Sequence, residues 1–377
     1  MLRLHRAFGC LLALSGGAAC EREAPPAPTA PVAAAPHRVA AALSSATGFE
    51  LVAAPGGLRL LWALESSAAG WLQVAELTQD GTPREAPRSV PVPARTLRKV
   101  TDLVAAQVGE DLALAWLEQG KNEARAVATF TAGNTPAGLV DLGPAALVAE
   151  SARGNLALAP EPQQSRALVM WRGLEAPCVS SEPGPCTGFT FRRLRPGSAE
   201  VTGLPLSVPA ACASHSVQLS ASRGRFQYGV CTREGADPVT TMFSIQYDPE
   251  YARAEPLLRG CLPLDTVEAA ERPWLIADCR GKRRAVPVPG LDERAEAEWL
   301  DAPQITCTPE RAEIRQGRFV LALREPRARL ESVLPASFAP SGGRVGWTGR
   351  SLVVAAATSG RLETRAFSCR AGKLQPL

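Results

Sequence analysis

Cysteines are the residues of this chain whose number and spacing indicate chemistry most clearly. The 377-residue sequence contains ten cysteines and three histidines. No two cysteines form the C-x₂-C pair typical of zinc sites, so the spacing favours disulfide bonds over metal ligation. We therefore expect disulfides, no metal site and no cofactor.

The last eight cysteines predict four disulfide bonds. Two pairs recur at nearly the same separation, 19 and 18 residues, and in matching positions of neighbouring sequence repeats. A third pair closes the short hairpin CVSSEPGPC, and the fourth follows by elimination. The expected bonds are Cys178–Cys186, Cys212–Cys231, Cys261–Cys279 and Cys307–Cys369.

His215, in the stretch CASHSVQLS, is the one histidine beyond the first 40 residues. A serine hydrolase would need a nucleophile beside it, and Ser214 and Ser216 are its nearest hydroxyls. Neighbours on a strand point to opposite faces of the sheet, so neither serine would face the imidazole. The sequence also lacks a G-x-S-x-G elbow and an H-E-x-x-H helix. We predict no catalytic residue here.

The N-terminal residues have the three parts of a secretory signal. Arg3, His5 and Arg6 precede the short apolar run Ala7–Leu14, and small residues then lead to Cys20. We predict that residues 1–19 are a signal peptide. The apolar run is far shorter than the ~20 residues that span a bilayer as a helix.

Residues 17–20, GAAC, resemble the lipobox of bacterial lipoproteins, although Gly17 stands where that family usually has Leu. The resemblance implies that Cys20 is acylated and becomes the N-terminus, and Glu21 in place of Asp implies the outer membrane rather than the inner. Cleavage by an ordinary signal peptidase is the alternative, but it would leave nine cysteines and one unpaired thiol. An even set of eight favours the lipid anchor.

Residues 20–40 are expected to form the acylated cysteine and a tether. The segment 21–36 contains five prolines and six alanines, a composition that favours extended conformations and buries no core. The folded domain is then predicted to cover residues 41–377.

A repeat organises that domain. The segments 51–65 and 103–118 each read as a strand, a glycine-containing turn and a second apolar strand, and a third strand follows. The apolar second strand recurs every 33–59 residues, seven times in all. This period is typical of propeller blades. We predict an all-β fold: a β-propeller of about seven blades (six to eight), with three to four antiparallel strands each, closed by residues near 40–48. Tandem β-sandwich domains are the alternative.

Aromatic and basic residues suggest where a ligand would bind. Trp62, Trp116 and Trp171 occupy mid-strand positions and are predicted core residues, whereas Trp71 and Trp347 are predicted exposed binding aromatics. The basic clusters 192–195 and 280–284 contain no interleaved aromatic residue and are interpreted as solvated loops and strand edges. The formal charge is only +4, and two of the positive residues, Arg3 and Arg6, lie in the leader. This small charge argues against a nucleic-acid surface.

The tether and repeats resemble exported β-propeller lipoproteins. The anchor, tether and repeat, together with the lack of a catalytic motif, lead us to expect a monomeric, membrane-anchored binding or scaffold protein of the cell envelope, without catalytic activity. Its expected ligand is a protein or an envelope polysaccharide. The alternative is a propeller glycoside hydrolase or lyase with carboxylates near the axis. The acidic residues near predicted turns are Asp102, Glu110, Asp111 and Asp265.

Overall fold

The computed structural model describes a β-strand protein whose described residues all lie within one compact unit, Ala33–Leu377. The described residues are 36–54, 56–65, 70–90, 92, 99–132, 135–147, 155–161, 166–173, 189–196, 198–201, 212–221, 226–233, 239–247, 250–269, 272–287, 298–300, 304–308, 311–316, 319–323 and 343–377. Among them no helix is long and apolar enough to cross a membrane.

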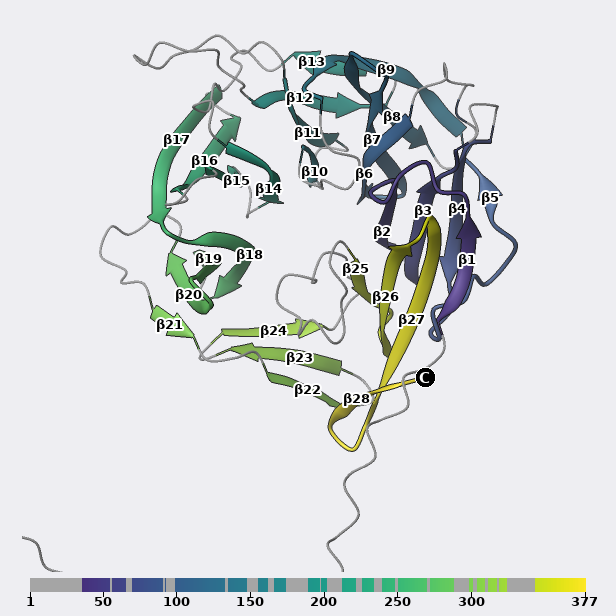
Figure 1. The fold of residues 1–377 in the computed structure, drawn as a ribbon, viewed down its shortest axis with the longest axis vertical. Helices are drawn as coiled ribbons and strands as arrows, with labels where there is room; N and C mark the ends of the chain where they lie inside the picture. Colours follow the sequence, from purple (N-terminus) through teal and green to yellow (C-terminus); the bar gives the residue numbers. More distant parts are fainter. Residues whose placement is uncertain are drawn as a thin grey trace, which may run out of the picture. The chain divides into compact units, whose positions relative to one another are not determined.

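The described strands form seven antiparallel sheets, whose strands are labelled in Figure 1. The first sheet contains β2 (Phe49–Ala54), β3 (Gly57–Ala63), β4 (Leu72–Leu77) and β5 (Arg88–Ser89). The second contains β6 (Lys99–Val108), β7 (Asp111–Gln119), β8 (Ala124–Ala132) and β9 (Thr135–Ala145). The third contains β10 (Leu156–Glu161), β11 (Arg166–Arg172), β12 (Phe189–Arg195) and β13 (Ser198–Val201).

The remaining four sheets follow in chain order. The fourth contains β14 (Cys212–Ala221), β15 (Phe226–Arg233), β16 (Val239–Tyr247) and β17 (Glu250–Arg259). The fifth contains β18 (Leu262–Ala269), β19 (Arg272–Cys279), β20 (Lys282–Pro287) and β21 (Glu298–Leu300). The sixth contains β22 (Gln304–Thr308), β23 (Arg311–Gln316) and β24 (Phe319–Leu323). The seventh contains β25 (Arg344–Trp347), β26 (Ser351–Thr358), β27 (Arg361–Arg370), β28 (Lys373–Pro376) and the N-terminal β1 (His37–Ala41).

Each sheet contacts the next, and the last contacts the first. The first strand of every sheet from the first to the fifth lies against the first strand of its neighbour, as β2 does against β6. In the sixth sheet β24 contacts β18, while β22 contacts the seventh sheet, and β25 contacts β2. Seven sheets in a closed order make the protein a β-propeller, as the repeat predicts. The number of blades stays a prediction, because the count covers the described residues alone.

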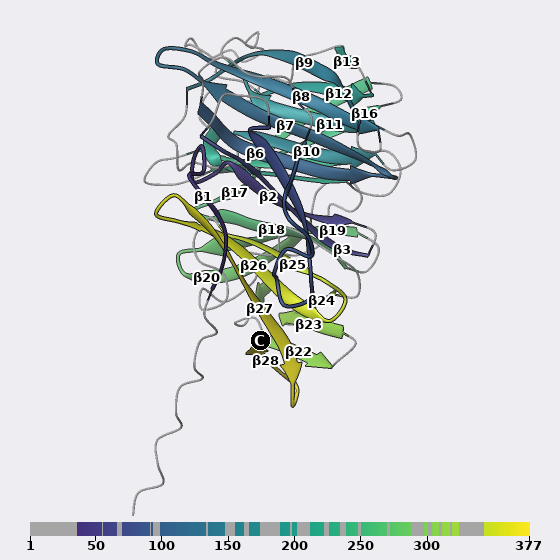
Figure 2. The same ribbon diagram turned by 90° about the vertical axis from the view of Figure 1, so that its right-hand side faces the viewer.

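Strand β7 shows why the sheets require their neighbours. Its central residues, from Leu112 to Leu117, are all buried, and alternate side chains belong to two different cores. Leu112, Leu114 and Trp116 pack with residues of the first sheet, such as Trp71. Ala113, Ala115 and Leu117 pack with residues of the third sheet, such as Val169. The strands of this second sheet can be followed in Figure 2. A strand that is apolar on both faces is stable here because a sheet covers each face.

The N-terminal segment links the last sheet to the first. Strand β1 pairs with β27 of the seventh sheet, from His37 opposite Thr364 to Ala41 opposite Arg361. Just after it, the Leu43 amide donates to the Gly360 carbonyl at 3.2 Å, and the Ser44 amide donates to the Ala63 carbonyl of the first sheet at 2.9 Å. The closing strand therefore starts at His37, a few residues before the segment 40–48 that the sequence predicts.

Two of the four predicted disulfides are present. Cys261 and Cys279 join the start of β18 to the end of β19, and Cys307 and Cys369 join β22 of the sixth sheet to β27 of the seventh. The cysteines at positions 178 and 186 lie outside the described residues. The side chains of positions 212 and 231 also lie outside them, although their strands β14 and β15 are paired.

Removing these bonds should destabilise the fold to different degrees. The loop entropy of the unfolded chain predicts a loss of about 4 kcal/mol for Cys307→Ser/Cys369→Ser, which opens a 62-residue separation. The same reasoning predicts about 3 kcal/mol for Cys261→Ser/Cys279→Ser, with a separation of 18. Denaturant unfolding of both double variants measures the two losses. An equal or reversed order would contradict the loop-entropy account.

Candidate functional site

Asp102 is the predicted acidic residue whose surroundings the structure describes most fully. It lies in β6 where the pairing with β7 is irregular, and its φ of 51° is in the left-handed region that Asp tolerates better than most residues. Its Oδ2 accepts hydrogen bonds from the amides of Asn155, at 2.7 Å, and Leu156, at 2.9 Å. Its own amide donates to Thr47 Oγ1 at 3.0 Å. One fully buried residue thus connects the first, second and third sheets.

Glu50 and Arg344 form a second polar link between sheets. Glu50 lies in β2 and Arg344 in β25, and the distance from Glu50 Oε1 to Arg344 Nε is 2.9 Å. The two side chains are 1% and 10% exposed, so this ion pair is buried. Glu50 Oε1 also accepts a hydrogen bond from the Leu51 amide at 3.1 Å. The pair joins the first sheet to the seventh, where the order of sheets closes.

These inner-strand carboxylates are engaged in structural bonds. Asp102 Oδ2 accepts hydrogen bonds from two backbone amides, Glu50 Oε1 pairs with Arg344, and both residues are buried. Glu110 and Asp111 lie at the β6–β7 turn, at the opposite end of β6 from Asp102. The structure therefore does not bring Asp102 together with these two acids. The side chains of Asp265, in β18, and His215, in β14, lie outside the described residues.

The prediction that Trp71 and Trp347 form exposed contacts is wrong. Both side chains are 0% exposed. Trp71 packs edge-on against Trp116, with 5.2 Å between ring centroids, so it belongs to the core between the first and second sheets. Trp347 lies in β25 opposite Leu352, which is also fully buried. The core prediction for the mid-strand tryptophans is confirmed: Trp62, Trp116 and Trp171 are all buried.

The exposed tryptophan is Trp299, which the sequence analysis did not single out. It lies in β21, the last strand of the fifth sheet, and is 60% exposed. Strand pairing sets it opposite Arg284 of the basic segment 280–284. The Arg284 guanidinium carbon lies 5.3 Å from the centroid of the Trp299 ring, within the range of a cation–π contact. The sequence stretch 280–284 contains no aromatic residue, and strand register supplies one from β21.

The other basic segment has a different environment. Arg192 in β12 lies 5.9 Å from the ring centroid of Trp171. Trp171 is 2% exposed, and its Nε1 donates to the Pro144 carbonyl at 3.1 Å. This aromatic ring belongs to the core, and β12 pairs with β11 on one side and β13 on the other, so the segment 192–195 does not lie at the edge of its sheet.

The register of the fifth sheet separates charges between its faces. Directly opposite residues share a face and alternate residues along a strand share a face. Lys282, Arg284 and Trp299 therefore lie on one face. Arg283 lies on the other face, opposite Asp278, and burial lowers the pKa of Arg283 while Asp278 opposes that shift. We call Arg280, Lys282, Arg284 and Trp299 the basic–aromatic patch.

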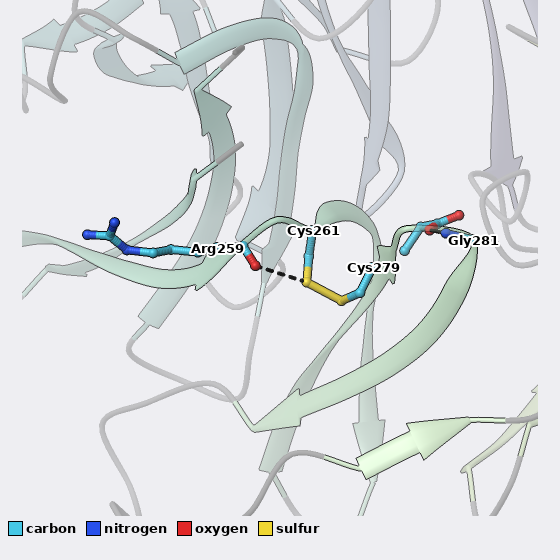
Figure 3. The surroundings of a disulfide bond; sticks show 5 residues. Arg259, Cys261, Cys279 and Gly281 are labelled. Atoms are coloured by element: carbon cyan, nitrogen blue, oxygen red, sulfur yellow. Dashed lines mark hydrogen bonds between the residues drawn. A yellow bond between two sulfur atoms is a disulfide. The ribbon is translucent and has the colours of Figure 1, made fainter. Parts of the chain in front are cut away.

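A disulfide supports the turn that begins this patch. Cys279 ends β19, and Arg280 and Gly281 then turn the chain into β20, where the Gly281 amide donates to Asp278 Oδ1 at 2.6 Å. Figure 3 shows Cys279 bonded to Cys261, whose sulfur lies 3.5 Å from the Arg259 carbonyl oxygen. The covalent bond fixes the end of β19 to the start of β18 and thus limits movement of the turn.

Comparisons with known proteins give distant matches. No protein-family model matches the chain, and no curated protein matches it. The chain is similar to a periplasmic gluconolactonase of Pseudomonas aeruginosa, with a TM-score of 0.44, 14% identity and coverage of 87% of this chain and 95% of that one. It is also similar to a Trypanosoma rangeli sialidase, with a TM-score of 0.39, 10% identity and coverage of 82% of this chain.

A third match is a subtype N10 neuraminidase-like protein of A/little yellow-shouldered bat/Guatemala/060/2010, with a TM-score of 0.39, 9% identity and coverage of 89% and 97%. The chain spans 59% of the length of the sialidase. We assign no activity from matches of this kind, and the propeller fold is assigned from the protein's own sheets.

Breaking the buried ion pair should be costly. Glu50→Ala leaves the Arg344 guanidinium buried without its anion, and a loss of about 3–5 kcal/mol in the free energy of unfolding is expected. The double variant Glu50→Ala/Arg344→Met removes both charges and should recover part of that loss. Denaturant unfolding of the singles and the double measures the coupling. Additive losses would mean that the pair does not link the two sheets energetically.

Proposed function

We propose that the protein is a membrane-anchored, extracytoplasmic β-propeller that acts as a binding or scaffold protein for an envelope component or a protein partner, and not as an enzyme. The observation that carries this proposal is the distribution of its polar groups. The carboxylates of Asp102 in β6 and Glu50 in β2 are buried, and each bonds to a group of a neighbouring sheet. The basic–aromatic patch, in contrast, presents a tryptophan that is 60% exposed. Exposed tryptophan and arginine residues are typical of binding surfaces.

The anchor in this proposal is Cys20. The leader (1–19), the acylated cysteine with its tether, and the propeller from β1 onward would be arranged in that order along the chain. Support comes from the lipobox-like residues before Cys20 and from the Pro/Ala-rich composition up to β1. Several acyl chains on one N-terminus bind a bilayer more stably than a single chain. Glu21 makes the outer membrane the proposed location.

A propeller glycoside hydrolase or lyase is the alternative, and one observation favours it. Asp265 lies in β18 at a pairing irregularity, as Asp102 does in β6. Acidic residues at such points of several inner strands would converge if their side chains turned inward. Release of reducing sugars from neutral and acidic polysaccharides, lost in Asp265→Asn, would establish this alternative and contradict the non-enzymatic proposal.

Replacing Cys20 should release the protein from the membrane. Without the thiol, no diacylglycerol is attached, so Cys20→Ser is expected to move from the membrane fraction to the soluble fraction. The measurement is fractionation of expressing cells followed by immunoblotting. Cys10→Ser, a change within the leader's apolar run, is the matched control and should stay in the membrane fraction. An unchanged distribution of the Cys20→Ser variant would refute the anchor.

Capture experiments test the binding role separately from the anchor. The purified full-length Cys20→Ser protein, carrying a C-terminal affinity tag, is mixed with a detergent-solubilised envelope extract. Recovery of one envelope component in stoichiometric amount is the expected result. If the tagged protein captures no envelope component and cleaves a polysaccharide instead, the binding role is contradicted. That result would leave the anchor proposal unaffected.

A further inference from the structure

We propose that the basic–aromatic patch binds a polyanionic polysaccharide, with a sugar ring on Trp299 and the negative charges on Lys282 and Arg284. The inference rests on the proposed function as an envelope-binding protein and names the ligand class of that function. The register of three strands in one sheet, β19 to β21, brings the residues of this patch together.

Trp299 supplies the flat apolar surface. Its side chain is 60% exposed on the last strand of the fifth sheet, and an apolar ring left in water gains free energy when a partner covers it. The Arg284 guanidinium lies over the ring with 5.3 Å between its carbon and the ring centroid. That contact restricts the rotamers of both side chains before a ligand arrives, which lowers the entropy cost of binding.

The cations that share the face of Trp299 are available for a ligand. In the part of the chain that the structure describes, no carboxylate forms an ion pair with Lys282 or Arg284. Arg280 and Lys282 are exposed in the turn and at the start of β20. The patch therefore presents positive charge that no carboxylate of the described residues pairs with, and the Arg284 guanidinium contacts the Trp299 ring.

Two carboxylates of the described strands, those of Asp278 and Glu298, lie on the opposite face of the same sheet. Asp278 is directly opposite Arg283, and Glu298 alternates with Trp299 along β21. Neither carboxylate shares the face that carries Lys282, Arg284 and Trp299. An anionic ligand on that face would therefore meet positive groups without direct repulsion from these two acids.

The spacing favours a polymer with repeated charges. Lys282 and Arg284 are two residues apart on one strand, and a strand rises about 3.3 Å per residue, so they are separated by about 7 Å along β20. Two cations at that separation bind successive negative groups of one chain better than they bind a single small anion. A sugar polymer also offers C–H faces to stack on indole, which distinguishes it from an acidic peptide.

The test uses the full-length Cys20→Ser protein, so that failure of the anchor does not affect it. The probes are polygalacturonate, neutral dextran and poly-glutamate, and isothermal titration calorimetry measures each affinity. We expect binding to polygalacturonate, little binding to dextran, and weaker binding to poly-glutamate than to polygalacturonate. Trp299→Ala and Lys282→Ala/Arg284→Ala are each expected to weaken polygalacturonate binding at least about tenfold.

Two controls make the result specific. Arg350→Ala/Lys373→Ala removes two exposed cations from the seventh sheet and should leave the affinity unchanged. Trp299→Phe keeps an aromatic face and should recover most of the affinity lost in Trp299→Ala. The charge variant should also reduce the salt dependence of binding, whereas the Trp299→Ala variant should keep it. Unfolding temperatures equal to that of the parent protein show that each variant is folded.

Several outcomes would overturn the proposal. Absence of polygalacturonate binding, equal binding to poly-glutamate, or an equal loss in the Arg350→Ala/Lys373→Ala control would each refute it. If the envelope extract still yields a partner whose capture is unaffected by Trp299→Ala, the proposed binding role stands and the patch assignment fails. Shortening of polygalacturonate during the titration would instead support the hydrolase or lyase alternative.

Discussion

The need to cover both faces of each sheet determines most of this structure. Strand β7 has apolar side chains on both faces, and they pack into two separate cores shared with the sheets on either side. A single four-stranded sheet with this composition would leave both apolar faces in water. Packing sheets in a closed order covers every face, and the N-terminal strand β1 completes the seventh sheet beside the first. Contacts between neighbouring sheets therefore hold together a chain that is otherwise made of local hairpins.

Polar groups buried between the sheets fix how the sheets are positioned against one another. Apolar contacts tolerate sliding, whereas the bonds of Asp102 to the amides of Asn155 and Leu156 have a fixed geometry. The ion pair of Glu50 and Arg344 does the same where the first and seventh sheets meet. We interpret these carboxylates as groups that fix the relative position of sheets. Removing water from a charged pair costs free energy. We therefore interpret these buried groups as selecting one arrangement of the sheets as much as adding to the free energy of unfolding.

The sequence was informative wherever the signal was local or periodic. Repeats of about fifty residues predicted the sheets. The pair Cys261 and Cys279 occupies the same positions in its repeat as Cys212 and Cys231 do in the one before, and this match predicted the Cys261–Cys279 bond. It failed for Trp71, whose position at the start of a strand says nothing about the neighbouring Trp116 that covers it. It also failed for Trp299, because fifteen residues separate it from Arg284 and the two meet through strand register alone. Register depends on the intervening turn, which composition does not specify.

The same constraint explains why a binding surface at the edge of a sheet is physically reasonable. Inner strands such as β6 are buried on both faces, so substituting them disturbs two cores at once. The last strand of a sheet has fewer neighbours, and its side chains can change without such a cost. Trp299 is on that kind of strand, while β19, two strands away in the same sheet, is held by the Cys261–Cys279 bond and by core residues Trp274 and Ile276. A rigid inner sheet thus presents a variable edge, an arrangement that favours the evolution of ligand contacts at β20 and β21.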